Sequence, residues 1–562
     1  MNILRSAIWI AVLLSTSTTC FAQATPSHTH LPYNRYHRFD ELESTLKRWC
    51  VQYPHLIRIR SLARTREGRD LWLVTLGIQS STVKSLTESK QYAFLGEQRI
   101  QFRSRPAVYI DGNHHGNEVA SGEVPLYLID YLLKNYTRYR TVHRLLNTRT
   151  LYIIPRVNPD AAEWYFRGVA IRGSVRSDDN DGDGRFDEDP PDDLDGDGLI
   201  LRMRLPGSRE TFPEGLDDDG DGRFNEDAPG SGIDLNRDYP DMSGSNAEAQ
   251  RLLCPETRAV HDFLLQHREI SEVQSFHTYG GILFRPFGSA PDSLIPTEDM
   301  AIYDMLGDAF FRYTGNRPTG RPYGPGGNIQ GSLLDWVYGR FGTYAVTPEL
   351  WRIPGEDTRN RFSYFGGLEG IVGPVAEARW RRFNRDVLQG RAFRPWTPFD
   401  HPTLGRIEIG GWSPFFRRNP PPEYLEDVCH RATLFSVYQS FCTPHLVLQS
   451  FLELKSTPSH RRFRLVIQNE GTFPTDSRWT RDHKMATPVI CRLNGNDHVQ
   501  TFQTPYLSGQ QSWPIEIEIP VDSKEIWTLE WFHPKGGGKR FQFRICTSAP
   551  IHKPFDKPSG RK

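Results

Sequence analysis

Two patterns of apolar and polar residues divide this chain. Between about Tyr33 and Glu349, short apolar runs typical of buried strands alternate with longer stretches in which apolar residues recur at helical spacing. Residues 107–111 form such a run, for example, and the periodic residues 124–133 follow it. Alternation of this kind predicts an α/β domain, for which we expect boundaries near residues 30 and 390.

The second pattern begins near residue 445, where strand-like runs follow one another without helical stretches between them. The runs lie at residues 445–449, 463–468, 515–519 and 527–532. This spacing predicts a small all-β sandwich over residues 445–548, followed by a disordered tail at 549–562. Residues 391–444 are rich in proline and aromatic residues, and we expect them to connect the two domains through a bridging helix from Glu423 to about Gln439.

The first residues are typical of a cleavable secretory signal. Arg5 precedes an apolar run that is too short to span a membrane, and small residues follow this run. We therefore predict a signal peptide at residues 1–22 and a secreted or periplasmic protein without a membrane span. An even set of cysteines remains after cleavage, which permits disulfides without defining their pairing.

Length and charge narrow the possible functions. The chain has 562 residues, which is too many for one ordinary core and favours two or more domains. Lysine and arginine together number 68, as do aspartate and glutamate, so the formal net charge is zero. This balance removes any overall electrostatic case for a nucleic-acid or acidic-membrane partner.

A candidate metal site follows the predicted strand at residues 107–111. His115 and Glu118 are three residues apart, so an imidazole nitrogen and a carboxylate from one tight turn could meet the same ion. Such a pair is a weak signal by itself, because a zinc site with one position open for water needs a third ligand from elsewhere in the fold. No cysteine has zinc-site spacing, so this ligand must be a histidine or a carboxylate.

Further motifs, in the same order along the chain, make this sequence resemble the zinc carboxypeptidase family of pancreatic carboxypeptidases and their bacterial relatives. The resemblance covers about Tyr33 to Arg352. Its motifs are Tyr53-Pro54, Arg66-Glu67-Gly68-Arg69, His115-Gly116-Asn117-Glu118, Asn158-Pro159-Asp160, Asp234-Leu235-Asn236-Arg237, Ser275-Phe276-His277-Thr278-Tyr279, Gly331-Ser332, Asp335-Trp336 and Thr347-Pro348-Glu349-Leu350.

The resemblance implies a mixed sheet sandwiched by helices and one catalytic Zn²⁺. It assigns His115, Glu118 and His277 as the three zinc ligands. It also implies that Asp234 accepts a hydrogen bond from the first zinc histidine and fixes the tautomer of that ring. A turn cap is the alternative role for Asp234.

The resemblance also indicates how a peptide would be bound. Asn236 and Arg237 are similar to the family's clamp for the free α-carboxylate of a substrate, a group that a planar guanidinium matches with two hydrogen bonds. Tyr323 is the candidate for the family's mobile tyrosine, although its spacing to Gly331-Ser332 is longer than usual.

Two more residues would carry the chemistry. The resemblance makes Glu349 the general base, which takes a proton from zinc-activated water and passes it to the leaving amine. An arginine should stabilise the oxyanion, but an acidic insertion interrupts the segment that normally carries it. Arg172 is the preferred candidate for this role, and Arg176 is the alternative.

The acidic, glycine-rich insertion occupies residues 178–227. The pattern Asp-x-Asp-x-Asp-Gly occurs in it three times, beginning at Asp179, Asp193 and Asp217. Alternating oxygen ligands followed by glycine resemble the beginning of a calcium loop, although no glutamate stands at the twelfth position of an EF-hand. The expected structural Ca²⁺ ligands are Asp179, Asp181, Asp183, Asp187, Asp193, Asp195, Asp197, Asp217, Asp219, Asp221 and Asn225. A disordered acidic run is the alternative.

Together these features predict a secreted zinc carboxypeptidase that hydrolyses the C-terminal bond of peptides and proteins. The family-like sequence begins shortly after the signal, so we expect no zymogen stage. A cell-wall peptide amidase, a γ-D-glutamyl peptidase or a deacylase of the same fold is one alternative. An inactive, calcium-bound surface adhesion protein is an alternative of a different class, and the intact set of three ligands with Glu349 argues against it.

Overall fold

The computed structural model describes residues 31–79, 82–83, 99–179, 182, 184–218, 220, 222–225, 228–240, 252–288, 291–320, 329–353, 374–523 and 525–545. The predicted signal at 1–22, the predicted tail at 549–562, Tyr323, and Asp181, Asp183, Asp219 and Asp221 lie outside these residues. No helix within the described ranges combines the length and apolar character that crossing a bilayer would require.

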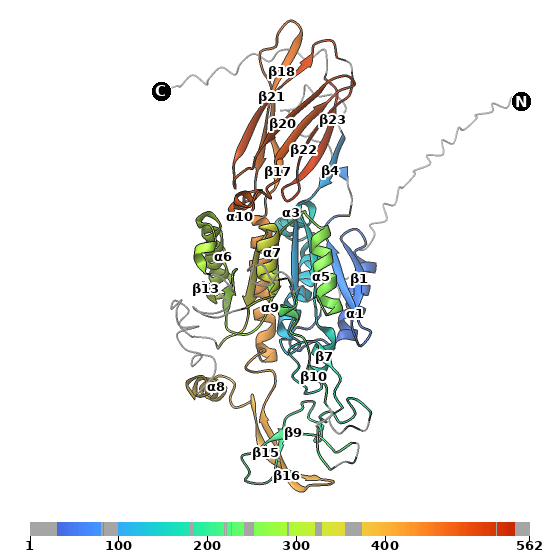
Figure 1. The fold of residues 1–562 in the computed structure, drawn as a ribbon, viewed down its shortest axis with the longest axis vertical. Coiled ribbons are helices and arrows are strands. Elements are labelled where there is room, and N and C mark those ends of the chain that lie inside the picture. The colour runs from blue at the N-terminus through green and yellow to red at the C-terminus, as the bar shows by residue number, and fades with distance from the viewer. Residues whose placement is uncertain are drawn as a thin grey trace, which may run out of the picture.

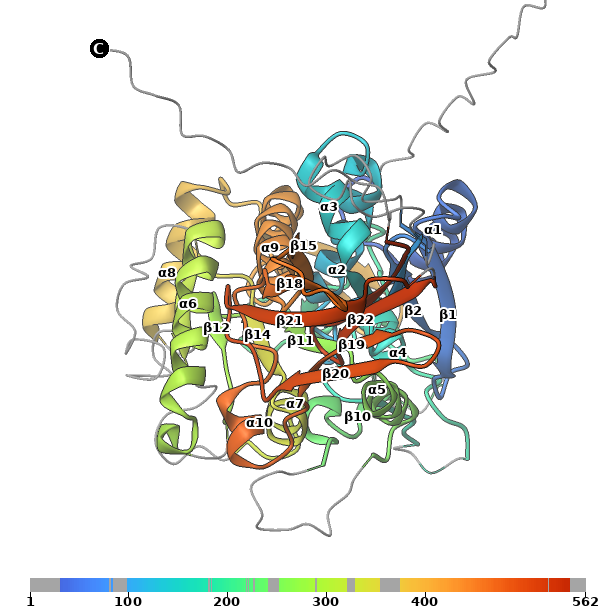
Figure 2. The same ribbon diagram turned by 90° about the horizontal axis from the view of Figure 1, so that it is seen from above.

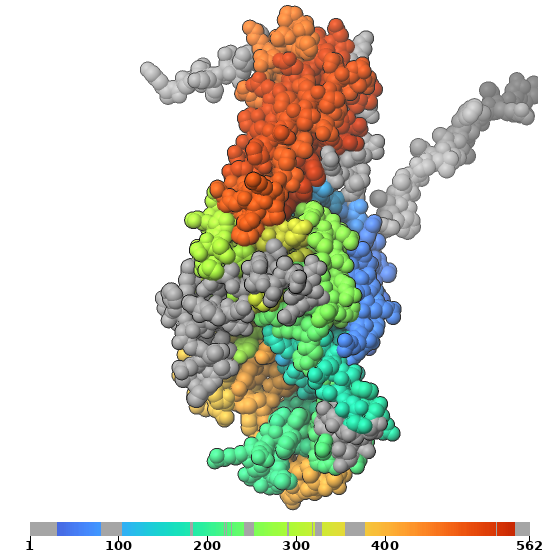
Figure 3. Space-filling view, viewed as in Figure 1, coloured from blue at the N-terminus to red at the C-terminus, as the bar shows by residue number. Residues whose placement is uncertain are grey.

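The described residues form three units along the long axis of the molecule (Figure 1). An α/β unit lies in the middle, a β-sandwich lies at one end, and a lobe that contains the acidic insertion lies at the other. The space-filling view shows the same order, with the sandwich and the lobe separated by the α/β unit (Figure 3). The β-sandwich and the lobe therefore lie at opposite ends of the α/β unit.

The α/β unit is built on an eight-stranded mixed sheet in the order β1-β2-β6-β5-β11-β14-β12-β13. The strands are β1 (Ile57–Arg64), β2 (Asp70–Leu76), β5 (Ala107–Gly112), β6 (Thr150–Ile154), β11 (Ile270–Phe276), β12 (Ile282–Phe284), β13 (Arg317–Gly320) and β14 (Tyr344–Glu349). The central strands β6, β5, β11 and β14 run parallel to one another. Every residue of β5 is buried, as expected of a continuous apolar strand that is covered on both faces. The predicted mixed α/β sheet is confirmed.

Helices cover both faces of this sheet (Figure 2). Val108 and Ile110 of β5 share one core with α1 (Phe39–Gln52), α2 (Ala120–Asn135), α3 (Arg140–Thr148) and α9 (Pro422–Cys442). The alternate residues Ala107 and Tyr109 share a second core with α5 (Pro255–Gln266) and α7 (Leu333–Phe341). The remaining helices include α6 (Thr297–Thr314), α8 (Pro374–Asp386) and α10 (Arg478–Asp482). The strand period of two thus divides β5 between two helical layers.

Capping residues explain two of the sequence motifs. Ser332 accepts a backbone N–H at the start of α7, and Gly342 ends this helix with a left-handed φ of 57°. Asn158 caps α4 (Pro159–Tyr165) in the same way, and Pro159 follows at the first helical position. The segments Gly331-Ser332 and Asn158-Pro159 therefore set where helices near the site begin.

A four-stranded sheet in the lobe joins two distant parts of the chain. Strands β8 (Arg202–Arg204) and β9 (Phe212–Pro213) belong to the insertion and pair with each other. Strand β8 also pairs with β16 (Gly405–Trp412), which forms a hairpin with β15 (Phe393–His401). A short ladder between β7 (Val175–Arg176) and β10 (Gly230–Ser231) closes the neck of the insertion. Residues 391–444 are thus more than the connection expected from the sequence, because the partner strand of this hairpin lies far away in the chain.

The β-sandwich contains a three-stranded and a six-stranded sheet around one core. The first sheet holds β17 (Leu446–Glu453), β18 (His460–Asn469) and β21 (Ser512–Pro520). The second holds β20 (Val499–Thr504), β19 (Val489–Asn494), β22 (Trp527–His533), β23 (Gly537–Phe543), β4 (Arg99–Ser104) and β3 (Thr82–Val83). The sandwich expected at residues 445–548 therefore also includes two strands from the N-terminal part of the chain. Ser104 of β4 pairs with Gly538 of β23.

The cysteines form no disulfide within the described residues. Cys50, Cys254, Cys429, Cys442 and Cys491 are free thiols, and all but Cys50 are buried. Cys546 lies outside the described residues. The four buried thiols therefore act as small core residues.

Candidate metal centre and active site

The turn after β5 brings His115 and Glu118 to the carboxyl ends of the parallel strands. Asn113 has a left-handed φ of 63°, and its Nδ2 donates a hydrogen bond of 2.6 Å to the carbonyl oxygen of His115. A side chain at Gly116 would collide with α4, because its Cβ would lie 2.2 Å from Ala161 Cβ. The turn therefore requires glycine between the two candidate ligands.

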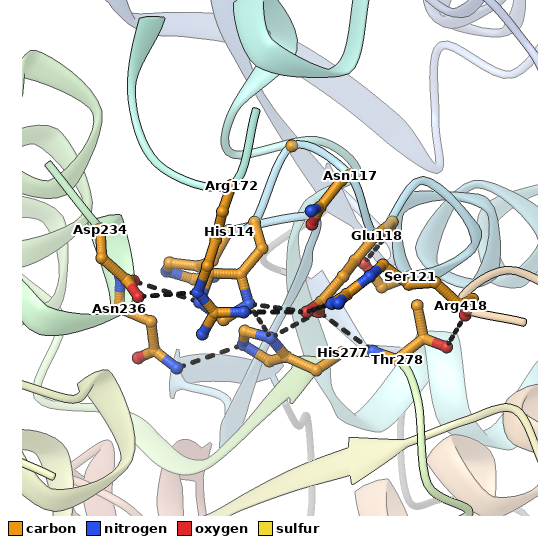
Figure 4. A network of polar contacts seen from close by, with 12 residues as sticks. His114, Asn117, Glu118, Ser121, Arg172, Asp234, Asn236, His277, Thr278 and Arg418 are labelled. Atoms are coloured by element: carbon orange, nitrogen blue, oxygen red, sulfur yellow. Dashed lines mark hydrogen bonds and ion pairs between the residues drawn. The ribbon is translucent and has the colours of Figure 1, made fainter. Parts of the chain in front are cut away.

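The buried side chains of His115, Glu118 and His277 converge at this point. Figure 4 shows Glu118 and His277 pointing toward each other. His115 Nδ1 lies 3.0 Å from Glu118 Oε1, His277 Nδ1 lies 3.0 Å from Glu118 Oε2, and the two Nδ1 atoms are 3.1 Å apart. Ligands about 2.0–2.1 Å from a tetrahedral Zn²⁺ lie roughly 3.3 Å apart, so these spacings fit a single ion. Two imidazole nitrogens this close to each other also fit metal ligands better than hydrogen-bond partners, because one proton at most can lie between them.

His114 points away from the converging donors. Its Nε2 lies 3.0 Å from Tyr239 Oη, and its Nδ1 lies 3.3 Å from Ser275 Oγ. Both ring nitrogens are therefore occupied by hydroxyl groups of the core. The two adjacent histidines therefore make different contacts.

Asp234 contacts the His115 ring on its other side. Its Oδ1 lies 3.1 Å from His115 Nε2 and also accepts the backbone N–H of Asn236 at 2.9 Å. Both contacts considered for this aspartate, the one with histidine and the turn cap, are thus present. Burial alone would raise the pKa of Asp234, but the hydrogen bond with His115 and the charges of His115, Arg172 and Arg237 hold this pKa well below its usual range. The charged carboxylate orients the imidazole so that Nδ1 faces Glu118.

Glu349 ends β14 beside His277, with which it forms an isolated parallel bridge. Within the described part of the chain, its buried Oε2 has no hydrogen-bond partner. Burial and the negative charge of Glu118 raise the pKa of the Glu349 carboxyl well above its usual range, although Arg172 and Arg418 oppose this shift. A buried carboxyl beside the candidate metal donors is suited to exchange a proton with a reacting group.

Arg172 reaches the site and Arg176 does not. Arg172 Nε donates to Asp234 Oδ2 at 3.0 Å, and its Nη1 lies 3.4 Å from Glu118 Oε1. Arg176 Nη2 instead donates to Asp178 at 3.0 Å on the surface. Of these two arginines, only Arg172 lies where it can face a substrate.

Asn236 and Arg237 lie in a short 3₁₀ turn, η3 (Leu235–Arg237), at the edge of the site. Asn236 Nδ2 is 3.4 Å from His277 Nε2, and its Oδ1 accepts the Leu333 N–H at 3.0 Å. Arg237 Nη1 donates to the Asn236 carbonyl oxygen at 2.6 Å. Both side chains are partly buried. They lie at one edge of the group formed by His115, Glu118 and His277, which we call the cluster.

Two of the remaining sequence motifs meet behind the site. Asp160 Oδ1 accepts hydrogen bonds of 2.8 Å from Thr65 Oγ1 and from Arg69 Nη1, and its Oδ2 accepts the Glu67 N–H at 3.0 Å. The segment Arg66-Glu67-Gly68-Arg69 is therefore fastened to α4, whose Ala161 packs on Gly116. These motifs support the metal-binding turn without contacting the donors.

Arg418 also reaches the site, although no sequence motif marks it. Its Nη1 lies 3.3 Å from Glu118 Oε1, and its guanidinium lies 5.4 Å from the centre of the Tyr279 ring. In the sequence this arginine belongs to Arg417-Arg418-Asn419-Pro420, which is typical of a solvated connection. No local pattern indicates its contact with Glu118, because only the fold brings the two segments together.

The fold and this buried donor set define an α/β metalloprotein with its site at the carboxyl ends of parallel strands. Residues 42–358 match the family model described as zinc carboxypeptidase. The chain belongs to the zinc carboxypeptidase family, and His115, Glu118 and His277 form its candidate zinc site.

Relatives in the family cover different shares of the chain. Carboxypeptidase D of Homo sapiens is 27% identical over 349 residues, which are 57% of this chain and 22% of the human protein. A zinc carboxypeptidase of Saccharothrix mutabilis subsp. capreolus is 29% identical over 132 residues, which are 24% of this chain and 26% of that protein. The crystal structure of thrombin activatable fibrinolysis inhibitor covers 73% of this chain and 74% of its own at 15% identity, with a TM-score of 0.42. The matched part thus spans about a fifth of the length of carboxypeptidase D.

Proposed function

We propose that this protein is a zinc carboxypeptidase that hydrolyses the C-terminal bond of peptides. The observation that carries the proposal is the convergence of His115, Glu118 and His277 beside the buried carboxyl of Glu349. Membership of the zinc carboxypeptidase family and similarity to proteins named carboxypeptidase D support it.

His115, Glu118 and His277 would hold the ion, because their donor atoms have the spacing and chemical type that Zn²⁺ prefers. When bound, Zn²⁺ supplies a Lewis acid that polarises the scissile carbonyl and makes water more acidic. Asp234 keeps the His115 ring in the orientation needed for binding. Side chains around these three residues would transfer the proton and bind the substrate.

Glu349 would act as the general base and then as the general acid. Its carboxylate accepts a proton from the attacking water and delivers that proton to the leaving amine. The raised pKa of Glu349 suits the second step, because a carboxyl that holds the proton can deliver it to the leaving amine.

Two borders of the site would bind the substrate. Asn236 and Arg237 donate hydrogen bonds to the free α-carboxylate, which requires Arg237 to exchange its present contact with the Asn236 carbonyl for the ligand. Arg172 stabilises negative charge on the carbonyl oxygen of the scissile bond. Its partial exposure and its contact with Glu118 support this role.

Zinc analysis combined with a peptide panel tests the proposal. The purified protein should contain about one zinc per chain and should release single C-terminal residues from peptides with a free carboxylate. Matched peptides with an amidated C-terminus should be cleaved far more slowly. Equal cleavage of free and amidated peptides would contradict an exopeptidase and favour an amidase of the same fold.

We also propose that the acidic insertion binds Ca²⁺ as a structural ion. Asp193, Asp195 and Asp197 can bring their oxygens within 4.8 Å of one another. The neighbouring Glu214 is buried, and its Oε2 has no hydrogen-bond partner among the described residues. Burial, with the charges of Asp195 and Asp193 adding to it, raises the pKa of Glu214 to about 7, so a cation here would relieve the repulsion.

The other two repeats support a common turn. Asp179 accepts the N–H groups of Gly182 and Gly184, and Asp217 accepts those of Gly220 and Gly222. Asp187 and Asn225 occupy equivalent left-handed positions, with φ values of 61° and 59°. The repeats therefore share one backbone design, which supports a shared ligand.

Export of the chain is a further part of the proposal. The signal-like composition of residues 1–22 supports it. N-terminal sequencing of protein recovered outside the producing cell, in the periplasm or medium, should find a chain that begins near Ala22. A chain that retains Met1 and stays inside the cell would contradict export.

A further inference from the structure

A short segment beyond the family match forms one wall of the candidate active site. Residues 414–420 lie between β16 and α9, whereas the match ends at residue 358. Side chains from four separate parts of the α/β unit donate hydrogen bonds to its carbonyl oxygens. They are Tyr165 Oη to Pro414 (2.8 Å), Trp351 Nε1 to Phe416 (3.0 Å), Thr278 Oγ1 to Arg418 (2.6 Å) and Tyr36 Oη to Pro420 (2.6 Å). The segment is therefore an integral part of this unit.

Asn419 connects the segment to the metal-binding turn itself. Its side chain is fully buried, its Oδ1 accepts the Ala120 N–H at 3.0 Å, and its Nδ2 donates to the Asn117 carbonyl oxygen at 3.0 Å. Asn117 and Ala120 flank Glu118 closely in the sequence. The backbone at Arg418 is consequently held in a fixed position relative to Glu118.

The Arg418 side chain projects into the site from this fixed backbone. Its Nη1 approaches Glu118 Oε1 at 3.3 Å, and Arg172 approaches the same oxygen at 3.4 Å. Glu118 is also a candidate metal donor, Arg172 pairs with Asp234 as well, and the charge of Glu349 also acts on Arg418. The Arg418 side chain is 35% exposed, so its guanidinium can also contact a substrate.

The position of Arg418 relative to the carboxylate clamp decides which part of a peptide it meets. Figure 4 shows Arg418 on one side of Glu118 and Asn236, with Asp234, on the other. A substrate whose terminal carboxylate lies at Asn236 and Arg237 places its scissile bond over the cluster. The rest of the peptide then runs towards Arg418 and Tyr279, on the N-terminal side of the cleaved bond.

We propose that Arg418 forms a subsite for the residue on the N-terminal side of the scissile bond and selects a carboxylate side chain there. This inference rests on the proposed carboxypeptidase function. A guanidinium recognises a carboxylate through charge-assisted hydrogen bonds and excludes lysine or arginine by repulsion. The substrate class is therefore peptides with aspartate or glutamate as the penultimate residue.

Two substrates that differ in one group test the inference. They are N-blocked tripeptides with the same C-terminal phenylalanine and with either glutamate or glutamine as the penultimate residue. The wild-type protein should cleave the glutamate peptide with a kcat/KM about 10-fold higher, as expected for one charged hydrogen bond. Arg418→Met should reduce this ratio to about 1, and Arg418→Lys should retain part of it.

The ratio is independent of the fraction of active protein, so partial loss of zinc or of folding in a variant does not change it. Arg417→Met is the matched control, because Arg417 pairs with Glu377 and lies over Trp412 rather than at Glu118; it should keep the wild-type ratio. A wild-type ratio near 1, or an unchanged ratio in Arg418→Met, would overturn the subsite. Failure of the zinc-loaded wild type to cleave either peptide would instead overturn the proposed function.

Discussion

His115 and Asp234 are joined through the imidazole nitrogen that faces away from Glu118: His115 Nε2 lies 3.1 Å from Asp234 Oδ1, and His115 Nδ1 lies 3.0 Å from Glu118 Oε1. Because Asp234 is the acceptor, the ring proton belongs on Nε2 and the lone pair belongs on Nδ1. The hydrogen bond thus prepares the histidine to bind a cation.

Asp234→Asn should therefore weaken zinc binding by about 10- to 100-fold, which is typical of losing such a partner. Competition with a chromogenic chelator measures the zinc Kd directly. Asp262→Asn is the matched control, because Asp262 contacts His261 on the surface at 2.9 Å. An unchanged zinc Kd in Asp234→Asn would show that this contact is only a turn cap.

Glu349→Gln should leave the zinc content unchanged and lower kcat by about 10²- to 10⁴-fold, since the variant keeps the proposed ligands and loses the base. Metal analysis and steady-state kinetics on the same preparation check both parts. Loss of zinc from this variant would identify Glu349 as a ligand.

Arg237→Ala should raise KM for peptides with a free carboxylate by about 10- to 100-fold, because a charged hydrogen bond to the substrate is lost. The slow cleavage of amidated peptides should change little. Arg258→Ala serves as the control, since Arg258 donates to the Leu252 carbonyl oxygen away from the cluster. A uniform loss across free and amidated peptides would contradict the clamp.

Glu272 on β11 should contribute less to the stability of the protein as the pH rises from about 4.5 towards 8. Burial raises the pKa of this carboxyl from 4.5 to about 8. The folded state holds the proton more tightly than the unfolded chain, so the contribution is fully present below pH 4.5 and is lost as the pH passes through about 8. Glu272→Gln should show a smaller decrease in unfolding free energy between pH 5 and pH 8 in urea titrations. The same slope as in the wild type would refute the assignment.

Removing Ca²⁺ with a chelator selective for it over zinc should lower the melting temperature. Carboxylates such as Asp193 and Asp195 then repel one another without a cation. Adding Ca²⁺ back should restore the melting temperature. Mg²⁺ at the same concentration is the control and should not restore it. No change in melting temperature, together with no calorimetric binding, would leave the insertion as an acidic loop.

Local patterns were sufficient to predict elements that position the candidate zinc site. The buried run at residues 107–111 forms most of β5, and the periodic residues 124–133 lie within α2. These predictions succeeded because the spacing of apolar residues within a short stretch of sequence distinguishes a buried strand from a helix. The expected helix from Glu423 is likewise present as α9.

Long-range pairing could not be predicted in the same way. The hairpin of β15 and β16 pairs with the insertion, and Arg418 meets Glu118, through contacts between segments far apart in the chain. A strand pattern shows which residues can pair but does not show with which partner. Family resemblance did not help either, because Arg418 lies beyond the residues that the family model covers.

The pairing of β4 with β23 has a consequence for synthesis and proteolysis. Ser104 leaves the ribosome hundreds of residues before its partner Gly538, an interval of tens of seconds at about 5–20 residues per second. During this interval the strand that will close the sandwich has an unpaired edge, which is a template for wrong pairing. Once these strands have paired, one sheet contains strands from the first and last thirds of the chain, so a protease that removes β23 also removes one of the two neighbours of β4. The sandwich therefore depends on strands from both the N-terminal and the C-terminal parts of the chain, and it is not a separable C-terminal domain.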